Sequence, residues 1–239
     1  MAATKTDSPL CKPVLGYWNV RGIAQPIRYM LEYIGKPYEN KVYNFKDGAS
    51  PSEFRAEWLK DKEALSRGDD ALDFPNLPYY LDGKVKITQS LAIMRYLARK
   101  NGLYADGSEE ETQQDMLEAQ VDDFRWHLIN YCKYDVLDAL RWASYTDAIE
   151  GQLKLLSDYL GEKKWLLGDR LTFVDFLLYE ALDQHRLFKE GCLNAFPNLH
   201  EYHERFRDLP AIKAYLESGR FREWPVFGGP VKRWGYKKE

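Results

Sequence analysis

The sequence predicts two parts, an α/β domain followed by an all-helical domain. Up to Lys100, short β-prone runs alternate with stretches in which apolar residues recur every three or four positions. Beyond Ser108 only the helical spacing remains, and no convincing alternating strand is found in the sequence. The two patterns meet after Asn101–Gly102, a helix stop signal, so we place the boundary within residues 101–107.

The first part begins with a strand and a helix. Val14–Trp18 is a short apolar run, and from Pro26 the apolar residues fall on one helical stripe that stops at Gly35. A second β-prone stretch, Tyr38–Phe45, follows this helix. The order strand, helix, strand is typical of an open α/β sheet, whose strand ends are where ligands usually bind.

A hairpin and a second helix complete the first part. Tyr79–Ile87 carries Asp82–Gly83 between two apolar arms, which is the signal of a hairpin with a two-residue turn. The run Leu91–Lys100 has apolar residues at helical spacing, and Ser90 stands in front of it as a cap. One α/β unit therefore ends at this helix.

The second part is a series of amphipathic helices. Ser108–Glu111 form a capping box that opens a long helix, whose apolar stripe reaches Cys132. Another apolar stripe runs over Ile149–Leu160. Thr172 and Asp175 form a variant of the capping box, which predicts a buried helix that begins at Thr172.

The two ends of the chain differ from the segments between them. Residues 1–12 are polar and lack the apolar stretch of a secretory signal peptide, so we expect a flexible extension. Trp224–Glu239 combines glycines and prolines with several aromatic residues. This tail is predicted to be non-helical, either a wrap or a loose end.

Composition excludes several classes of function. Lys and Arg number 34 against 37 for Asp and Glu, so the chain has no surplus of cations with which to neutralise the phosphate backbone of a nucleic acid. The apolar runs are far shorter than the ~18 residues that would suggest a membrane span. The three cysteines are far apart, which fits neither a disulfide framework nor paired metal ligands and indicates the cytoplasm. His200 and His203 have no third ligand near them, and we interpret them as part of a polar helix face with no metal.

Three places in the first part can carry chemistry. Tyr17 ends the first strand and can project into a cleft, although a tyrosine there is more often half-buried packing. Leu77–Pro78 opens a strand, and a cis bond, which the sequence leaves as open as a trans one, would free the Leu77 backbone to pair with an extended peptide. Thr88–Ser90 precedes a helix, so the free N–H groups of its first turn can hold a carboxylate, or Ser90 can simply cap the helix.

Together these places resemble the cytosolic glutathione transferases, most closely the mu class. The resemblance runs from Pro13 to Trp234 and rests on five segments in the same order. They are LGYWNVRG (Leu15–Gly22), LDFPNLPYYLDG (Leu72–Gly83), KITQSLAIMRYLARK (Lys86–Lys100), LTFVDFLLYEALD (Leu171–Asp183) and CLNAFPNL (Cys192–Leu199).

The resemblance implies a thioredoxin-like, glutathione-binding domain at residues 13–100, a linker at 101–107 and an all-helical domain with its tail at 108–239. It implies a cytoplasmic homodimer that conjugates reduced glutathione, as co-substrate, to small hydrophobic electrophiles in detoxification, with no permanently bound cofactor. By position, Tyr17 would donate a hydrogen bond to the glutathione thiolate. A free thiol has a pKa of ~8.5, so a bond given preferentially to the anion raises its population at neutral pH.

The resemblance also implies a glutathione site that follows the parts of the tripeptide. Its cations would face the glycyl carboxylate and its acid would face the γ-glutamyl ammonium group, as charge-assisted hydrogen bonding requires. Trp18, Arg55, Trp58 and Lys62 fall near the glycyl carboxylate, Asn76 and Leu77 at the peptide backbone, Gln89 and Ser90 at the γ-glutamyl end, and Asp123, from the partner subunit, at the ammonium group.

An electrophile pocket and a dimer contact are implied in the same way. Phe74 resembles the aromatic residue that inserts into the partner subunit in the mu class, and an exposed apolar side chain there supports dimerisation. A second hydroxyl that many mu enzymes place over the substrate falls at Lys133 here, so Tyr131 or Tyr134 is left to replace it. The rest of the apolar wall would be Tyr17, Val20, Ile23, Ile129 and the tail around Phe227.

Two loops depart from the mu pattern. Material that includes Ser66–Asp70 is inserted between Lys62 and Leu72, and the loop Asn44–Phe54 is slightly longer. Because these loops adjoin Lys62 and Arg55, they bear on the roles assigned to those two cations.

Two other functions remain as alternatives on this scaffold. A non-catalytic ligand carrier or a structural protein, such as the lens crystallins that resemble these enzymes, would not require Tyr17, Asn76, Gln89 and Ser90, all of which are present. A thiol-redox enzyme would need a reactive cysteine near the end of the first strand, where the sequence has Tyr17, Trp18 and Asn19. Conjugation is therefore the prediction, and the physiological electrophile is left open.

Overall fold

The chain divides into two structural units that do not follow its order. The computed structural model describes residues 12–46, 50, 52–68, 71–133, 139–228 and 234–235, with the backbone alone at residues 133 and 139–144. One unit combines the segment that ends at Asn19 with Lys36–Ile93, and the other combines Val20–Gly35 with the chain from Met94 onward. The first helix therefore belongs with the later helices, although it follows the first strand directly.

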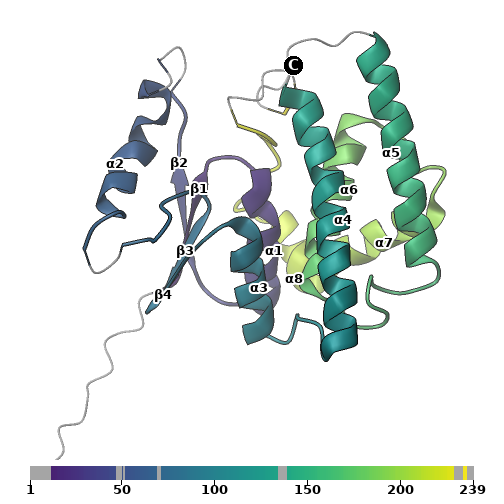
Figure 1. Cartoon of the computed structure of the whole chain (residues 1–239), viewed down its shortest axis with the longest axis horizontal. Coiled ribbons are helices and arrows are strands. Elements are labelled where there is room, and N and C mark those ends of the chain that lie inside the picture. The colour runs from purple at the N-terminus through teal and green to yellow at the C-terminus, as the bar shows by residue number, and fades with distance from the viewer. Residues whose placement is uncertain are drawn as a thin grey trace, which may run out of the picture. The chain divides into compact units, whose positions relative to one another are not determined.

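A four-stranded mixed sheet in the order β2-β1-β3-β4 is the centre of the first unit (Figure 1). β1 (Val14–Trp18) pairs in parallel with β2 (Glu39–Tyr43) and antiparallel with β3 (Tyr79–Asp82). A tight turn joins β3 to β4 (Val85–Thr88). In this register Gly16 of β1 lies opposite Tyr79 of β3, which brings the segment before β3 alongside the end of β1.

The connection after β2 carries a short 3₁₀ turn and a helix. The turn η2 covers Glu53–Arg55, and α2 covers Ala56–Ala64. Only Trp58 of α2 is buried, because the helix is polar over most of its surface. Trp58 packs against Tyr43 of β2 and Tyr79 of β3, and this contact fixes α2 to the sheet.

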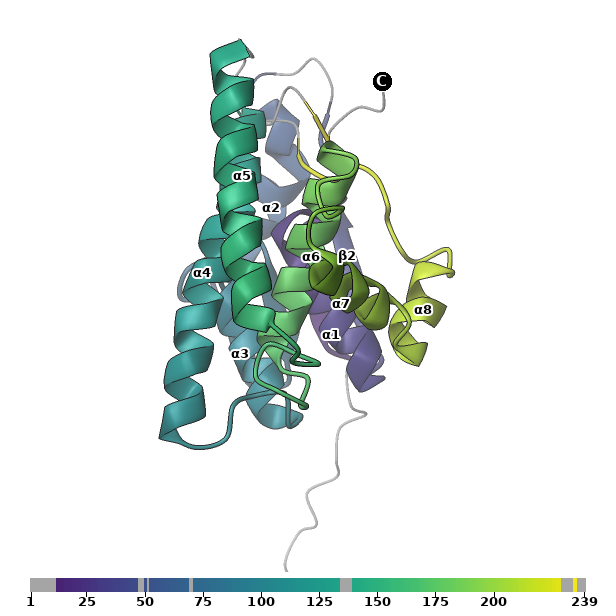
Figure 2. The same cartoon turned by 90° about the vertical axis from the view of Figure 1, so that its right-hand side faces the viewer.

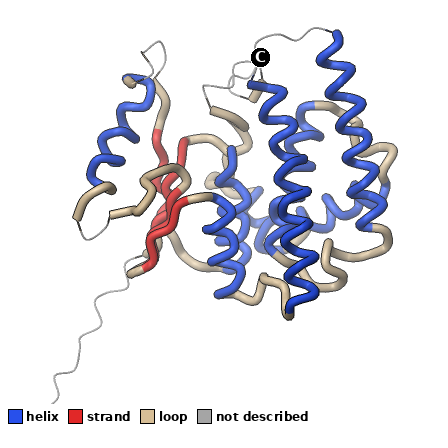
Figure 3. Tube along the Cα trace, viewed as in Figure 1, coloured by secondary structure: helices blue, strands red, loops and turns tan. Residues whose placement is uncertain are grey.

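Helices make up the regular structure of the second unit, as the blue tube in Figure 3 shows. Its longest members are α4 and α5, which Figure 2 shows as extended columns. α6 is its buried centre, because the side chains from Phe173 to His185 are all covered. The bounds are η1 Gly22–Ala24, α1 Gln25–Ile34, α3 Ser90–Lys100, α4 Ser108–Lys133, α5 Ala139–Leu160, α6 Phe173–Phe188, α7 Pro197–Arg207 and α8 Pro210–Leu216, with α3 shared between the units.

The fold class predicted from the sequence is confirmed: a mixed sheet and helices come first, and the elements described after Lys100 are helices. The predicted helix start at Thr172 is also confirmed, since Thr172 is the N-cap of α6 and forms a capping box with Asp175. The Asp175 carboxylate accepts hydrogen bonds from the Thr172 N–H at 2.8 Å and from the Leu166 N–H at 2.9 Å. The sequence interpretation did not identify α2, whose polar surface carries no apolar stripe.

One interpretation of the histidines was wrong. His203 does not lie on a polar helix face, because its ring is 1% exposed. Its Nε2 lies 3.1 Å from Asp183 of α6, and its Nδ1 lies 3.1 Å from Glu204. A buried carboxylate partner on another helix satisfies this ring, and one sequence cannot show such a partner. His200 is exposed, as predicted.

Candidate functional site

The end of β1 is shaped by a glycine that precedes the candidate tyrosine. A Cβ atom at Gly16 would lie 2.2 Å from Cε1 and Cζ of Tyr79, so only glycine allows Tyr79 to pack there. Tyr17 follows and is 8% exposed, whereas Leu15 on the same strand is fully covered. Tyr17 therefore packs into the unit as a buried side chain with a small accessible area.

The segment before β3 presents peptide groups beside the end of β1. The Leu77–Pro78 bond is cis. Among the described residues, the backbone N–H and C=O of Leu77 form no hydrogen bond. Asn76 is exposed and Leu77 is mostly buried. An extended peptide that lies along this segment would find both groups of Leu77 open to pairing.

The N-terminus of α3 lies in an unusual backbone conformation. Gln89 has φ of 73°, in the left-handed region that residues other than glycine rarely occupy. It is exposed, and its C=O accepts a hydrogen bond from the Ile93 N–H at 3.0 Å. The helix begins at Ser90, one residue earlier than predicted, and Ser90 is buried. Strain of this kind tends to be retained where a site needs it, and the first turn of a helix attracts anions.

The glycyl end of the predicted site falls on η2 and α2. Arg55 and Lys62 are both exposed, and between them Trp58 is buried against the sheet. The inserted loop does not distort α2, because the Leu72 N–H closes it with a 2.8 Å bond to the Leu65 C=O. Lys62 therefore stays in the last turn of a regular helix, although residues 69 and 70 of the insertion lie outside the described residues.

A polar network anchors the far end of α2 to the sheet. The Tyr43 hydroxyl donates to Asp61 at 2.9 Å and lies 2.9 Å from the Tyr79 hydroxyl, while Lys41 Nζ is 2.5 Å from Asp61. Burial together with the bonds to Tyr79 and Asp61 raises the pKa of Tyr43 far above its usual range. The Tyr43 hydroxyl therefore stays protonated and holds Asp61, the neighbour of Lys62 in α2. The sequence interpretation gave no role in the site to Lys41, Tyr43, Asp61 or Tyr79.

The residues predicted for the electrophile pocket lie in the second unit, apart from Tyr17. Val20 and Phe227 are buried, and hydrogen bonds bring their segments together: the Arg21 N–H donates to the Pro225 C=O at 2.9 Å, and the Gly22 N–H donates to the Val226 C=O at 2.8 Å. The described part of the tail is thus non-helical and wraps onto this segment, as one of the two predicted alternatives required.

A series of ring contacts links two further pocket candidates, Tyr131 and Phe227. Tyr131 is half-buried, and its ring centre lies 5.7 Å from Phe188. Phe188 contacts Trp234 at 5.1 Å, and Trp234 contacts Phe227 at 5.9 Å. Phe188 and Trp234 were missed in the sequence, where only their aromatic character could have marked them. Ile129 is buried and Ile23 half-buried, whereas Tyr134 lies outside the described residues.

Two candidates for contacts with a partner subunit are accessible. Phe74 is 75% exposed, an unusual state for a large apolar side chain. Asp123 is exposed on α4 of the second unit. Such surfaces suit contacts between subunits.

A buried ion cluster lies under the segment that follows β1. Arg21 is almost fully covered, and its Nη2 lies 2.6 Å from Glu180 and 2.7 Å from Asp183, both on α6. Burial acts to raise the pKa of Asp183, but the hydrogen bond to His203 and the charge of Arg21 outweigh it and hold the pKa well below its usual range. In the sequence, the acidic residues within the apolar run LTFVDFLLYEALD are the signal for this cluster, because buried charges are normally paired.

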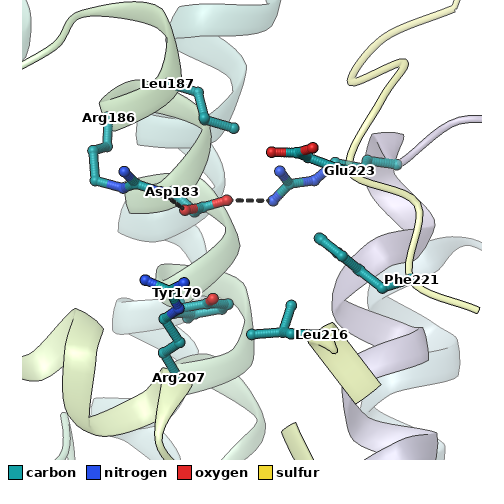
Figure 4. A pocket seen from close by; sticks show the side chains of 9 residues that line it. Tyr179, Asp183, Arg186, Leu187, Arg207, Leu216, Phe221 and Glu223 are labelled. Atoms are coloured by element: carbon teal, nitrogen blue, oxygen red, sulfur yellow. Dashed lines mark hydrogen bonds and ion pairs between the residues drawn. The ribbon is translucent and has the colours of Figure 1, made fainter. Parts of the chain in front are cut away.

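A cavity of about 390 Å³ in the second unit borders this cluster. Figure 4 shows Asp183 between Arg186 and the opposite wall, which carries Phe221 and Glu223. None of the predicted site residues lines the cavity. Because Arg21 and Asp183 are already paired across it, we interpret the cavity as an edge of the structural ion cluster and not as the substrate site.

Neither a metal centre nor a membrane span is found in the described part of the chain. No group of three or more His, Cys, Asp or Glu side chains there could hold a metal ion. Among the same residues, no helix is long and apolar enough to cross a bilayer.

Comparisons with known proteins match this geometry along most of the chain. Residues 13–99 match the family model for the glutathione S-transferase N-terminal domain, and residues 122–219 match that for the C-terminal domain. Glutathione S-transferase Mu 1 of Oryctolagus cuniculus is 48% identical over 213 residues, which are 89% of this chain and 94% of that protein. Glutathione S-transferase Mu 2 of Homo sapiens is 44% identical over 223 residues, 93% of this chain and 98% of the relative.

Solved structures give the same picture. The crystal structure of the glutathione S-transferase Blo t 8 superposes with a TM-score of 0.82 at 34% identity, over 92% of this chain and 98% of that one. The pi-class glutathione S-transferase of Onchocerca volvulus superposes with a TM-score of 0.75 at 27% identity, over 93% of this chain and all of that one. The likeness therefore covers the sheet and the helices alike.

Proposed function

We propose a mechanism in which Tyr17 activates the co-substrate. The premise is that this chain belongs to the glutathione S-transferase family. The chain is a glutathione transferase whose curated relatives are mu-class enzymes at 44–48% identity. It uses glutathione as co-substrate and, by our proposal, joins the glutathione sulfur to an electrophilic carbon of a small hydrophobic compound. The proposal concerns which residues of this chain do so.

One observation carries the proposal for the thiol. The pairing of Gly16 with Tyr79 brings the unpaired Leu77 backbone alongside the end of β1, where Tyr17 stands. A tripeptide whose middle residue pairs with Leu77 would hold its cysteinyl sulfur near the Tyr17 hydroxyl. That hydroxyl would donate to the thiolate more strongly than to the thiol. Each unit by which the thiol pKa falls corresponds to about 1.4 kcal/mol of preference for the anion.

The two ends of glutathione would be held by charge. At the γ-glutamyl end we assign Gln89 and Ser90, where the first turn of α3 offers N–H groups to a carboxylate. The glycyl carboxylate would meet Arg55 and Lys62, with Trp18 and Trp58 beside them. Asn76 would bind the peptide backbone. With both ends of glutathione fixed, its sulfur would be oriented for attack, which is an entropic contribution to the rate.

Further assignments complete the proposal. Val20, Ile23, Ile129, Tyr131 and Phe227 would supply an apolar wall for the electrophile. Phe74 would insert into a second copy of the chain in a homodimer, whose Asp123 would meet the ligand ammonium group. Residues 13–100 would form the glutathione-binding domain, 101–107 a linker and 108–239 the helical domain. Cytoplasmic location fits a co-substrate whose thiol must stay reduced.

Replacing Tyr17 by phenylalanine tests the mechanism. Tyr17→Phe should keep glutathione affinity, measured by calorimetry, while turnover with an aryl halide falls by about 100-fold, the typical loss when one donor to a developing anion is removed. The ultraviolet absorbance of bound glutathione, followed against pH, should show a higher thiol pKa in the variant. Tyr33→Phe, on the surface of α1, serves as the matched control. Unchanged turnover in Tyr17→Phe would remove Tyr17 from the mechanism.

A further inference from the structure

Three aromatic rings form a continuous stack in the first unit. The ring centres of Trp18 and Phe45 are 4.3 Å apart at an interplanar angle of 23°, and those of Phe45 and Phe54 are 4.6 Å apart at 21°. All three side chains are half-buried. The stack joins three elements, because Trp18 ends β1, Phe45 follows β2 and Phe54 lies in η2.

Hydrogen bonds support the same arrangement of the chain. The Asn19 N–H donates to the Tyr43 C=O at 2.8 Å, and the Asn19 side chain donates to Asn44 Oδ1 at 2.8 Å. The Asn44 N–H in turn donates to Glu57 of α2 at 2.8 Å. The segment after β2 is therefore tied to the end of β1 on one side and to α2 on the other.

The stack connects two residues that we assign to the same part of the ligand. Trp18 is one end of it, and Phe54 at the other end directly precedes Arg55. Phe45 lies between the two rings and contacts both. The stack therefore links the Trp18 indole to Phe54, the residue before Arg55.

We propose that Phe45 and Phe54 are positioning residues for the glycyl carboxylate of glutathione. This inference rests on the proposed function, because it takes Trp18 and Arg55 as contacts of that carboxylate. Arg55 is exposed, and an exposed arginine on a loose turn loses rotamer and backbone freedom when it binds. The stack removes the backbone part of this cost before the ligand arrives. The stack adjoins only residues assigned to the glycyl end, so it should affect the affinity for glutathione and not the rate of the chemical step.

Leucine and tyrosine substitutions separate stacking from bulk. Phe45→Leu and Phe54→Leu keep apolar volume but remove the ring, whereas Phe54→Tyr keeps the ring and can direct its hydroxyl to solvent. We expect the leucine variants to raise the KM for glutathione by about 3- to 10-fold, the range that loss of one aromatic contact implies. The kcat at saturating glutathione and the KM for the electrophile should stay within about twofold of wild type, and Phe54→Tyr should match wild type.

A truncated co-substrate locates the effect. γ-Glutamylcysteine has the thiol and the γ-glutamyl end but lacks the glycyl residue, so the stack has no contact to position for it. Wild type and the leucine variants should therefore use γ-glutamylcysteine with KM values that agree within about twofold. Leu59→Ala is the matched control, because Leu59 is an exposed apolar side chain of α2 outside the stack, and it should behave as wild type with both co-substrates.

The outcomes distinguish the inference from the proposed function. Equal losses of the leucine variants with glutathione and with γ-glutamylcysteine, or a Phe54→Tyr variant as impaired as Phe54→Leu, would overturn the positioning role while conjugation by wild type stands. If wild type itself conjugates neither co-substrate, the proposed function fails first. If circular dichroism shows that Phe45→Leu is unfolded, the comparison of Phe54→Leu with Phe54→Tyr decides, because Phe54 is at one end of the stack.

Discussion

The Tyr145 hydroxyl donates a hydrogen bond to Nδ1 of His185 at 2.7 Å in the core of the helical unit. Nε2 of the same ring lies 3.1 Å from the Phe124 carbonyl oxygen, which can only accept, so Nε2 carries the proton. Because burial disfavours the charged ring, it is neutral and its proton on Nε2 leaves Nδ1 as the acceptor for Tyr145. Burial lowers the pKa of His185 to about 3, although the bond to Phe124 acts in the opposite direction.

His185 should destabilise the fold as the pH falls. An unfolded histidine takes up a proton near pH 6.5, whereas the folded ring stays neutral until about pH 3, so the unfolded state binds more protons between these values. Stability from this group is present above pH 6.5 and is lost as the pH falls, by about 2 kcal/mol at pH 5. Burial lowers the pKa of His127 too, and His127 acts in the same direction.

A measurement of this pH dependence must allow for Asp175, because burial raises the pKa of its carboxyl group to about 6. That shift favours folding at low pH and opposes the histidines over the same range. Urea unfolding at pH 7.5 and pH 5 should therefore compare wild type with His185→Gln, which cannot take up a proton. The variant should lose less stability on acidification than wild type does. An identical loss in both proteins would show that His185 is not the group responsible.

Arg21 should be essential for stability because it is the cation of the buried cluster. Arg21→Met would leave Glu180 and Asp183 buried without it, at a cost of about 3 to 5 kcal/mol in the free energy of unfolding. Arg207→Met is the control, since Arg207 is exposed and lies 3.9 Å from Glu204, a pair that contributes at most about 1 kcal/mol. Denaturant titration of both variants checks this, and similar small losses in both would contradict it.

Gly16 should tolerate no side chain while Tyr79 is present. In Gly16→Ala the new methyl group would meet the Tyr79 ring, which is bonded through its hydroxyl to Tyr43, so the strand or the ring must shift. Overpacking of this kind costs about 1 to 3 kcal/mol, and turnover should fall because Tyr17 is the next residue. Adding Tyr79→Leu to Gly16→Ala should recover part of the stability lost in the single variant. No recovery in thermal denaturation would point to another cause.

Gln89 should show a conflict between stability and binding. Gln89→Gly would relieve the left-handed backbone and stabilise the fold by up to about 1 kcal/mol. The same change removes the side chain assigned to the γ-glutamyl group, so the KM for glutathione should rise. Gln89→Ala keeps the backbone strain and removes the amide, and it should raise the KM without the gain in melting temperature. If Gln89→Gly lowers the melting temperature, the backbone there is not strained.

The local order of the chain was predictable because it depends on short-range chemistry. The strand at Val14–Trp18, the hairpin of β3 and β4 and the capped start of α6 at Thr172 all follow from residues close together in sequence. The two-residue turn of the hairpin is Gly83–Lys84, one residue later than the predicted Asp82–Gly83, because Asp82 still pairs with Val85 in the ladder. The family resemblance likewise depends on contiguous segments. The sequence by itself therefore determined the fold class, the family and the candidate residues of the glutathione site.

Only the tertiary structure decided which distant residues meet. His203 was misinterpreted because Asp183, twenty positions away, is on another helix. The Trp18–Phe45–Phe54 stack and the Tyr43–Asp61 network were not visible for the same reason: their members come from separate elements, and each residue taken alone fits ordinary packing. A side chain's surroundings depend on which elements pack together, and periodicity along one element contains no information about its neighbours.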